Sequence, residues 1–100
     1  MKILVVDDDL NVTTVLMGLL TREGYTVFPA SSAEEALPIL ESELACVITD
    51  LKMPGKSGID LLKAAREKQP GLPVILITAH GDIDTAVAAM KGGAYDFITK

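Results

Sequence analysis

Three consecutive carboxylates follow an apolar run near the start of the chain. The run Ile3–Val6 leads directly into Asp7, Asp8 and Asp9. Clustered carboxylates raise one another's pKa and destabilise a fold unless a cation lies among them. Oxygen ligands with no soft ligand beside them select Mg²⁺ or Mn²⁺ over Zn²⁺. Asp9 is placed to cap a following helix, so Asp7 and Asp8 are the candidate metal ligands.

Polar residues also stand at the ends of three later apolar runs. Asp50 stands just after the segment Cys46–Ile48, and Thr78 directly follows Val74–Ile77. Lys100 ends the segment that begins at Tyr95. In an open α/β sheet, the ligand site lies at the carboxyl ends of the strands. Each residue alone has a simpler role, such as a strand cap or a solvated terminal lysine. One polar group after each of four strands instead favours a shared site.

The chemistry that suits this set of residues is phosphoryl transfer to an aspartate. A metal held by few protein ligands keeps coordination positions for water and a phosphoryl oxygen. The Lys100 ammonium is a point charge suited to phosphate, and the Thr78 hydroxyl is a hydrogen-bond donor. A carboxylate held beside the metal is a nucleophile toward phosphorus. The metal and the lysine would balance the charge that develops on the phosphoryl oxygens.

Three short unbroken apolar runs and two further segments predict the strands that position these groups. Unbroken β-branched runs are typical of strands buried on both faces of a parallel sheet. The last run alternates in polarity, which suits an edge strand. The expected strands are Ile3–Val6, Tyr25–Phe28, Cys46–Ile48, Val74–Ile77 and Tyr95–Lys100.

Amphipathic stretches between these runs predict four helices. Apolar residues recur at the helical spacing of one buried face. The predicted buried faces are Val12, Val15, Leu16 and Leu19; Ala33, Ala36, Leu37 and Leu40; Ile59, Leu62 and Ala65; and Ile83, Ala86, Val87 and Met90. Ser32 and Glu35 form a predicted capping box, and Pro38 is expected to kink or shorten the second helix. The alternating order predicts an α/β domain with right-handed crossovers.

Length and composition limit the class of protein. The 100 residues, of which 49% are hydrophobic, suit one packed domain. A net charge of −5 without a Lys/Arg cluster argues against a nucleic-acid surface. The single Cys46 excludes a disulfide within the chain and is expected to be a buried small hydrophobe. With no targeting or membrane-spanning segment, the expectation is a soluble, cytoplasmic protein.

Four segments together resemble the receiver domain of bacterial two-component response regulators, the CheY-like family. They are ILVVDDD (3–9), VITDLKMPGKSGIDLL (47–62), PVILITAHGD (73–82) and GGAYDFITK (92–100). The resemblance covers the whole chain, so residues 1–100 are expected to form one receiver domain. It implies a flavodoxin-like, doubly wound parallel sheet of five strands in the order 2-1-3-4-5. The wording of residues 78–100 is most similar to receivers of NtrC-type transcriptional activators.

The resemblance also implies roles for the acidic residues. Asp50 corresponds to the phosphoacceptor. Asp7 and Asp8 correspond to the acidic pair that holds Mg²⁺, with Asp50 and the backbone carbonyl of Lys52 completing the protein ligands. Mn²⁺ is an acceptable substitute. Lys52 also occupies one of two positions that tune the lifetime of the phosphoryl group in this family; the other is His80, for which an exposed loop side chain is an equally good interpretation.

Three further residues correspond to the family's switch. Thr78 resembles the hydroxyl that moves toward the phosphoryl group, and Lys100 resembles the lysine that pairs with it. Phe97 lies where the family has a rotating aromatic residue. The expected function is therefore a signalling switch rather than an enzyme. The resemblance implies that a sensor histidine kinase phosphorylates the domain. It also implies that the face of the fourth helix and fifth strand signals to an output domain or partner, with homodimerisation on activation as an option.

One departure from the family concerns the last segment. The family continues beyond the lysine with a fifth helix packed beside the first, whereas this sequence stops at Lys100. We therefore expect a receiver domain truncated after its fifth strand. Without that helix, an apolar patch on the first, third and fourth strands is expected to be exposed.

Three alternative functions compete with the receiver interpretation. The first is a phosphatase of the haloacid dehalogenase type, in which Asp7 and Asp9 form a D-x-D motif and Thr78 and Lys100 serve as later motifs. This scheme gives Asp50 no role and leaves no room for a substrate-covering cap. The second is a degenerate receiver that binds partners without phosphorylation. The third, nucleotide binding, lacks a glycine-rich loop after the first strand.

Overall fold

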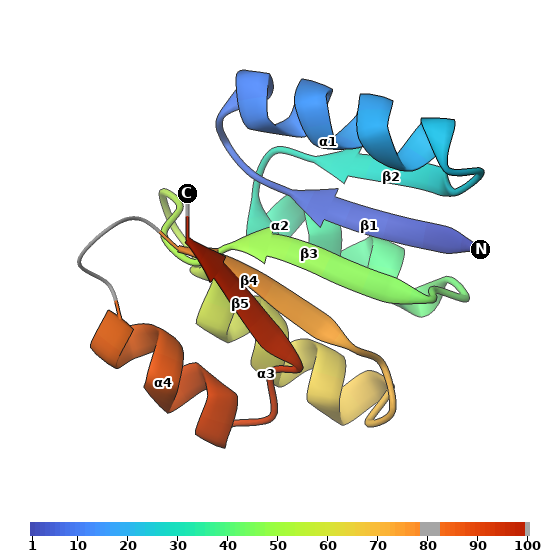
Figure 1. The fold of residues 1–100 in the computed structure, drawn as a ribbon. Coiled ribbons are helices and arrows are strands. Elements are labelled where there is room, and N and C mark those ends of the chain that lie inside the picture. Colours follow the sequence, from blue (N-terminus) through green and yellow to red (C-terminus); the bar gives the residue numbers. More distant parts are fainter. Residues whose placement is uncertain (79–82, 100) are drawn as a thin grey trace.

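Five parallel strands form the centre of the structure, and helices lie on both sides of them (Figure 1). The computed structural model describes residues 1–78 and 83–99, apart from the side chain of residue 41. The elements are β1 (Lys2–Val6), α1 (Leu10–Arg22), β2 (Thr26–Ala30), α2 (Ala33–Ala36), the 3₁₀ helix η1 (Leu37–Glu41), β3 (Cys46–Asp50), α3 (Gly58–Lys68), β4 (Val74–Thr78), α4 (Ile83–Lys91) and β5 (Asp96–Thr99).

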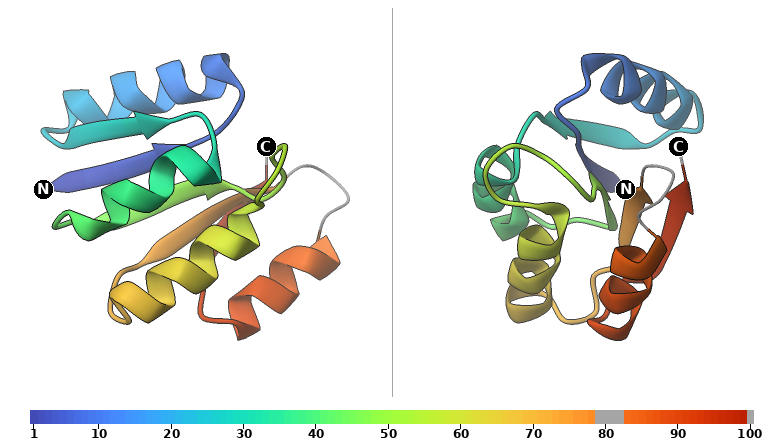
Figure 2. Two further views of the ribbon diagram at one scale, coloured as in Figure 1. Left: turned by 180° about the vertical axis from the view of Figure 1, so that it is seen from behind. Right: turned by 90° about the vertical axis from the view of Figure 1, so that its left-hand side faces the viewer.

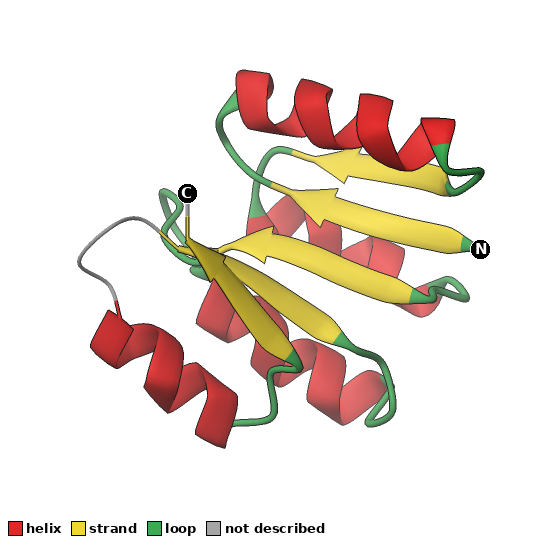
Figure 3. Ribbon diagram, viewed as in Figure 1, coloured by secondary structure: helices red, strands yellow, loops and turns green. Residues whose placement is uncertain are grey.

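The strand order confirms the expected doubly wound topology. The strands lie in the order β2-β1-β3-β4-β5, and all four neighbouring pairs are parallel (Figure 3). In register, Val6 of β1 faces Thr49 of β3, and Asp50 faces Ile77 of β4. Strand order reverses between β1 and β3, so the carboxyl ends of these two strands form the switch point where ligands bind in such sheets.

The two faces of the sheet are covered unequally. Helices α2, α3 and α4 lie on one face, whereas α1 lies on the other without a second helix among the described residues (Figure 2). Side chains alternate along a strand, so Leu4 and Val6 join the larger cluster under α2–α4. Ile3 and Val5 join the smaller cluster under α1.

Helix starts follow the local capping chemistry. The Asp9 carboxylate caps α1 by accepting a hydrogen bond from the Asn11 N–H at 2.9 Å, as predicted. The Ser32 hydroxyl likewise accepts from the Glu35 N–H at 3.0 Å. In a capping box the Glu35 carboxylate would accept from the Ser32 N–H. Here it accepts from the Ser31 hydroxyl at 2.8 Å.

Pro38 shortens the second helix, as expected. The α-helical segment ends at Ala36, and the chain continues as the 3₁₀ helix η1 with proline in its first turn. Proline has no N–H to donate and its ring crowds the preceding turn, so it is tolerated only near a helix start.

Two of the predicted buried helix faces are partly wrong. Val15 and Leu19 of α1 are 60% and 52% exposed, and Ile83 and Val87 of α4 are 46% and 43% exposed. An apolar stripe shows which residues favour burial but not which neighbour covers them. The sheet contacts only one edge of the α1 stripe, where Val12, Leu16 and Leu20 pack against the smaller cluster.

An apolar groove remains beside α1. It has a volume of about 440 Å³ and is lined mainly by apolar side chains from α1 and from strands β3, β4 and β5 (Val12, Val15, Leu16, Ile48, Ile77 and Ile98). Its presence agrees with the exposed patch expected on this side of the sheet. No helix among the described residues has the length and apolarity needed to cross a bilayer.

Candidate functional site

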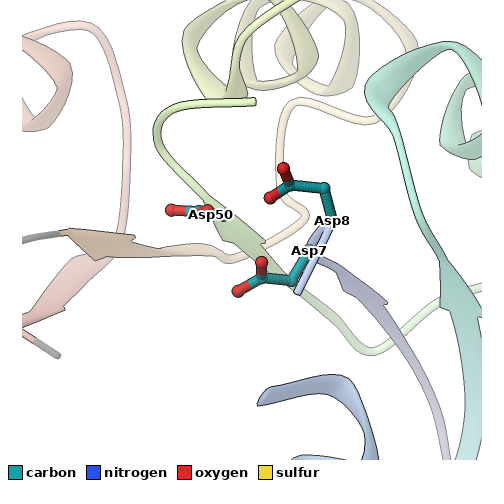
Figure 4. Close-up of side chains that lie close together, drawn as sticks. All are labelled: Asp7, Asp8 and Asp50. Carbon is teal, nitrogen blue, oxygen red and sulfur yellow. The ribbon is translucent and has the colours of Figure 1, made fainter. Parts of the chain in front are cut away.

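Three carboxylates converge where β1 and β3 end side by side. Asp7 and Asp8 directly follow β1, and Asp50 is the last residue of β3. One carboxylate oxygen from each lies within 4.8 Å of the others (Figure 4). Asp7 and Asp50 are 2% and 5% exposed, whereas Asp8 is exposed to solvent. The cluster is thus held in the protein on one side and open to solvent on the other.

Backbone contacts hold Asp7 in place. Its Oδ1 accepts a hydrogen bond from the Asp9 N–H at 2.9 Å, and its own N–H donates to the Ala30 carbonyl at 3.1 Å. The buried Thr13 hydroxyl lies 3.4 Å from the Asp7 carbonyl oxygen and 3.3 Å from that of Asp9. The first turn of α1 therefore fixes the position of this carboxylate.

The donor set suits a hard divalent cation. Three carboxylates this close repel one another, and a bound cation converts that repulsion into attraction. All three offer oxygen, which Mg²⁺ prefers, and no thiolate or imidazole of the described residues joins the cluster. The exposed side at Asp8 leaves room for water and an incoming oxygen ligand. This arrangement could hold a metal ion.

Thr78 lies at the same edge of the sheet. It is the last residue of β4 and follows Ile77, which faces Asp50 in register. The side chain is fully buried, and its hydroxyl has no hydrogen-bond partner among the described residues. A buried hydroxyl without a partner is costly, so this donor is suited to a polar group that arrives from outside the domain.

The remaining predicted site residues differ in burial, and two of them lie outside the described residues. Phe97 of β5 is half-buried and packs against the larger cluster. Lys52 is exposed on the loop that follows β3, and this loop turns at Gly55, whose φ of +79° favours glycine. His80 and Lys100 lie outside the described residues.

Cys46 plays no part in this chemistry. The thiol lies at the opposite end of β3 from Asp50 and is half-buried. Burial raises the pKa of the Cys46 thiol, against a smaller opposing effect of its hydrogen bond to Val47. The thiol therefore stays protonated at neutral pH, although it is half-buried rather than buried as expected.

Two residues that contact the Asp50 backbone were not predicted from the sequence. The Thr49 hydroxyl donates to the Asp50 carbonyl oxygen at 3.0 Å. The Cα of Gly58 lies so close that a β-carbon there would be 2.3 Å from the same oxygen. The one sequence signal was a glycine directly after the serine that caps α3, where a better helix former is usual.

Comparison with known proteins identifies the family. The family model described as the response regulator receiver domain matches residues 3–100. The chain belongs to this family. The observed strand order agrees with the receiver fold of this family. The position of Asp9 weighs against the D-x-D scheme, because its carboxylate caps α1.

Relatives and solved structures support the same placement. The transcriptional regulator NtrC of Proteus hauseri is 43% identical over 97 residues, which cover 96% of this chain and 20% of that protein. A receiver domain protein from Clostridium thermocellum superimposes with a TM-score of 0.94 at 41% identity, covering 99% of this chain and 81% of that one. The response regulator TrrA of Thermotoga maritima, solved in complex with Mg²⁺–BeF, gives a TM-score of 0.87 at 33% identity, covering 99% and 85%.

The chain is much shorter than its curated relatives. It spans 20–22% of the length of the response regulators of the NtrC and DctD type that it matches. Both of these relatives are transcriptional regulatory proteins, as the NtrC-like wording of residues 78–100 predicted.

Proposed function

We propose that this receiver domain accepts a phosphoryl group on Asp50 in the presence of Mg²⁺ and acts as a signalling switch. The observation that carries the proposal is the convergence of Asp7, Asp8 and Asp50, with ligand atoms within 4.8 Å. Mg²⁺ bound by these carboxylates and the Lys52 carbonyl would neutralise charge on the phosphoryl oxygens. The Mg²⁺–BeF complex of the related TrrA domain supports this choice of metal; Mn²⁺ is the alternative.

The proposed reaction is an in-line displacement at phosphorus. A carboxylate oxygen of Asp50 forms a bond to phosphorus while the bond from phosphorus to a histidine nitrogen of a sensor kinase breaks. The electron pair of the broken bond returns to the imidazole nitrogen. Burial of Asp50 restricts the carboxylate to a narrow range of positions, which favours attack from a defined direction.

The proposed switch begins at Thr78. Its buried hydroxyl donates to an oxygen of the new phosphoryl group, and Lys100 pairs with another oxygen. Phe97 then turns into the space that the Thr78 side chain leaves, which shifts the face of α4 and β5 between two arrangements. Lys52 and His80, two residues beyond the acceptor and the threonine, tune how long the phosphoryl group survives.

The proposed partners are a sensor histidine kinase and an output domain or downstream protein. Three large apolar side chains of the α4 and β5 region are exposed: Ile83 and Val87 of α4, and Tyr95, which directly precedes β5. Such a face suits a protein partner rather than a nucleic acid, and it could also join two activated domains. Because the relatives are transcriptional regulators, we propose a cytoplasmic role in transcription control.

We further propose that residues 1–100 function as one receiver domain without turnover of exogenous substrates. Its chemistry is then limited to accepting the phosphoryl group and losing it by hydrolysis. Incubation with a generic phosphate ester and Mg²⁺ should release no more phosphate than the buffer does.

Intact-mass analysis tests the phosphoacceptor directly. The protein is incubated with acetyl phosphate and Mg²⁺, and the wild type should gain the mass of one phosphoryl group. Asp50→Asn should gain none, because an amide is not a nucleophile toward phosphorus. Asp9→Asn, which keeps a helix-capping side chain, is the matched control and should be labelled like the wild type. Equal labelling of Asp50→Asn would refute the assignment.

A further inference from the structure

The backbone of Asp50 is fixed from the face of the sheet covered by α2–α4. Thr49 precedes Asp50 in β3, and its register partners Val6 and Leu76 both belong to the larger cluster on that face. Gly58 begins α3, which lies on the same face. A side chain of β3 and the start of α3 therefore meet at the peptide that carries the acceptor.

Thr49 contacts this peptide through a buried hydrogen bond. The residue has no exposed surface, and its hydroxyl donates to the Asp50 carbonyl oxygen at 3.0 Å. The bond fixes the peptide group that follows the Asp50 Cα. The next residue is tied as well, because the Leu51 N–H donates to the Ile77 carbonyl at 2.9 Å.

Gly58 contacts the same peptide through close packing. A β-carbon at this position would lie 2.3 Å from the Asp50 carbonyl oxygen and 3.0 Å from the Leu51 Cα, both backbone atoms. The Gly58 N–H donates to the Leu51 carbonyl at 2.9 Å. Glycine is needed here for close approach, since its φ lies outside the left-handed range. Any larger residue must displace either the start of α3 or the Asp50 backbone.

We propose that Thr49 and Gly58 are positioning residues that hold the Asp50 carboxylate in register with Asp7 and Asp8. They touch neither metal nor phosphoryl group and act through the Asp50 backbone. A displacement on the order of 1 Å in a reacting group costs about 100-fold in rate, and loss of supporting contacts around metal ligands typically costs about 10- to 100-fold in affinity or activity. The inference rests on the proposed function for the Mg²⁺ affinity and the labelling rate, whereas the metal-free Asp50 amide resonance tests the positioning without it.

The test compares four variants with the wild type. Thr49→Val removes the hydroxyl at constant shape, and Thr49→Ser restores it. Gly58→Ala adds the clashing β-carbon, whereas Gly71→Ala adds one where no atom lies within 4 Å. Each protein is titrated with Mg²⁺ alone by calorimetry, its labelling rate with acetyl phosphate is measured, and the amide resonance of Asp50 is recorded without metal. Chemical denaturation reports stability separately.

Thr49→Val and Gly58→Ala are expected to lower Mg²⁺ affinity and labelling rate about 10-fold each and to shift the metal-free Asp50 amide resonance. Thr49→Ser and Gly71→Ala should match the wild type.

Unchanged Mg²⁺ affinity and labelling rate in a folded Thr49→Val protein would overturn the inference, as would a loss that Thr49→Ser fails to restore. Should Gly58→Ala not fold, the two Thr49 variants decide the matter. A wild type that binds Mg²⁺ but is never labelled would instead refute the proposed function. The Mg²⁺ titrations would still test whether Thr49 and Gly58 position the Asp50 carboxylate.

Discussion

Asp7, Asp8 and Asp9 are adjacent in the chain, but their carboxylates have different surroundings. Asp7 is buried and held by the Asp9 N–H, Asp8 is exposed, and Asp9 caps α1. The triplet therefore divides into two members of the acidic cluster and one structural residue. The preference of aspartate for helix caps had predicted the same division from the residue types alone.

Mg²⁺ is expected to stabilise the protein against heat, because a cation bound only by the folded state relieves the repulsion within the cluster. At a Mg²⁺ concentration of 100 times the dissociation constant, the gain in unfolding free energy is about 2.7 kcal/mol. Differential scanning calorimetry with Mg²⁺ or with EDTA measures it. Asp8→Ala should abolish the gain.

Asp9→Ala provides the control for this measurement. Loss of the helix cap should lower the unfolding free energy by about 1 kcal/mol while leaving the Mg²⁺-dependent gain intact. If Mg²⁺ does not raise the melting temperature of the wild type, the acidic cluster is not a metal site, even though the fold is correct.

At the scale of elements, the start of α3 combines a cap with the loop that follows the acceptor strand. The Ser57 hydroxyl accepts from the Asp60 N–H at 3.4 Å, and the Asp60 carboxylate accepts from the Ser57 N–H at 2.9 Å. This reciprocal capping box satisfies two donors that the helix leaves unpaired. The next residue, Gly58, is the one that packs against Asp50, so the cap also defines where α3 meets the acceptor.

Ser57→Ala is expected to lower the unfolding free energy by about 1 kcal/mol, measured by urea denaturation at pH 7. Gly71→Ala serves as a control outside any cap. A loss of stability no greater than that of the control would mean that the cap contributes little to this helix.

The same cap predicts a pH dependence. The Ser57 N–H lowers the pKa of the exposed Asp60 carboxyl below its ordinary value of 3.8. The folded state thus binds the proton more weakly than the unfolded state. The resulting stabilisation is fully present above pH 3.8 and is lost as pH falls through the lower folded pKa. Asp60→Asn should weaken the pH dependence of the urea-denaturation midpoint across this acidic range. A pH dependence equal to that of the wild type would contradict this role of Asp60.

At the scale of the whole molecule, the sheet is covered by α2, η1, α3 and α4 on one face and, among the described residues, by α1 on the other. The apolar groove beside α1 exposes Val15, and Ile98 of β5 is 55% exposed along it. Large contiguous apolar surfaces are uncommon on monomeric proteins and bind apolar molecules. Ile77, by contrast, is only 6% exposed and belongs to the smaller cluster.

The groove is expected to bind an environment-sensitive hydrophobic dye in the native state. Ile98→Lys should weaken dye binding, because it places a charge along the groove. Its effect on the unfolding free energy should stay within about 0.5 kcal/mol, since the side chain is half exposed. Val87→Lys, on the exposed face of α4, is the matched control. Equal dye fluorescence in the wild type, Ile98→Lys and Val87→Lys would show that the groove is not the binding surface.

Much of the molecule could be predicted from sequence because the relevant forces are local. Three unbroken apolar runs and two mixed segments predicted the five strands within one or two residues at either end. Asp9, Ser32 and Pro38 predicted where helices begin or end. The convergence of Asp7, Asp8 and Asp50 followed from topology alone, since parallel strands end at a common edge. Relatives of the predicted family then confirmed the receiver fold.

Only the tertiary structure decided which apolar and polar residues are covered, and by what. Val15 and Leu19 carry a periodicity typical of a buried face yet remain exposed, because burial depends on a neighbour that the periodicity does not specify. Thr49 and Gly58 gave almost no chemical signal in the sequence. Gly58 meets Asp50 only because α3 begins against the end of β3, so its importance depends on a distance in space. Thr49 is next to Asp50 in the chain, but only the structure shows that its hydroxyl bonds to the Asp50 carbonyl.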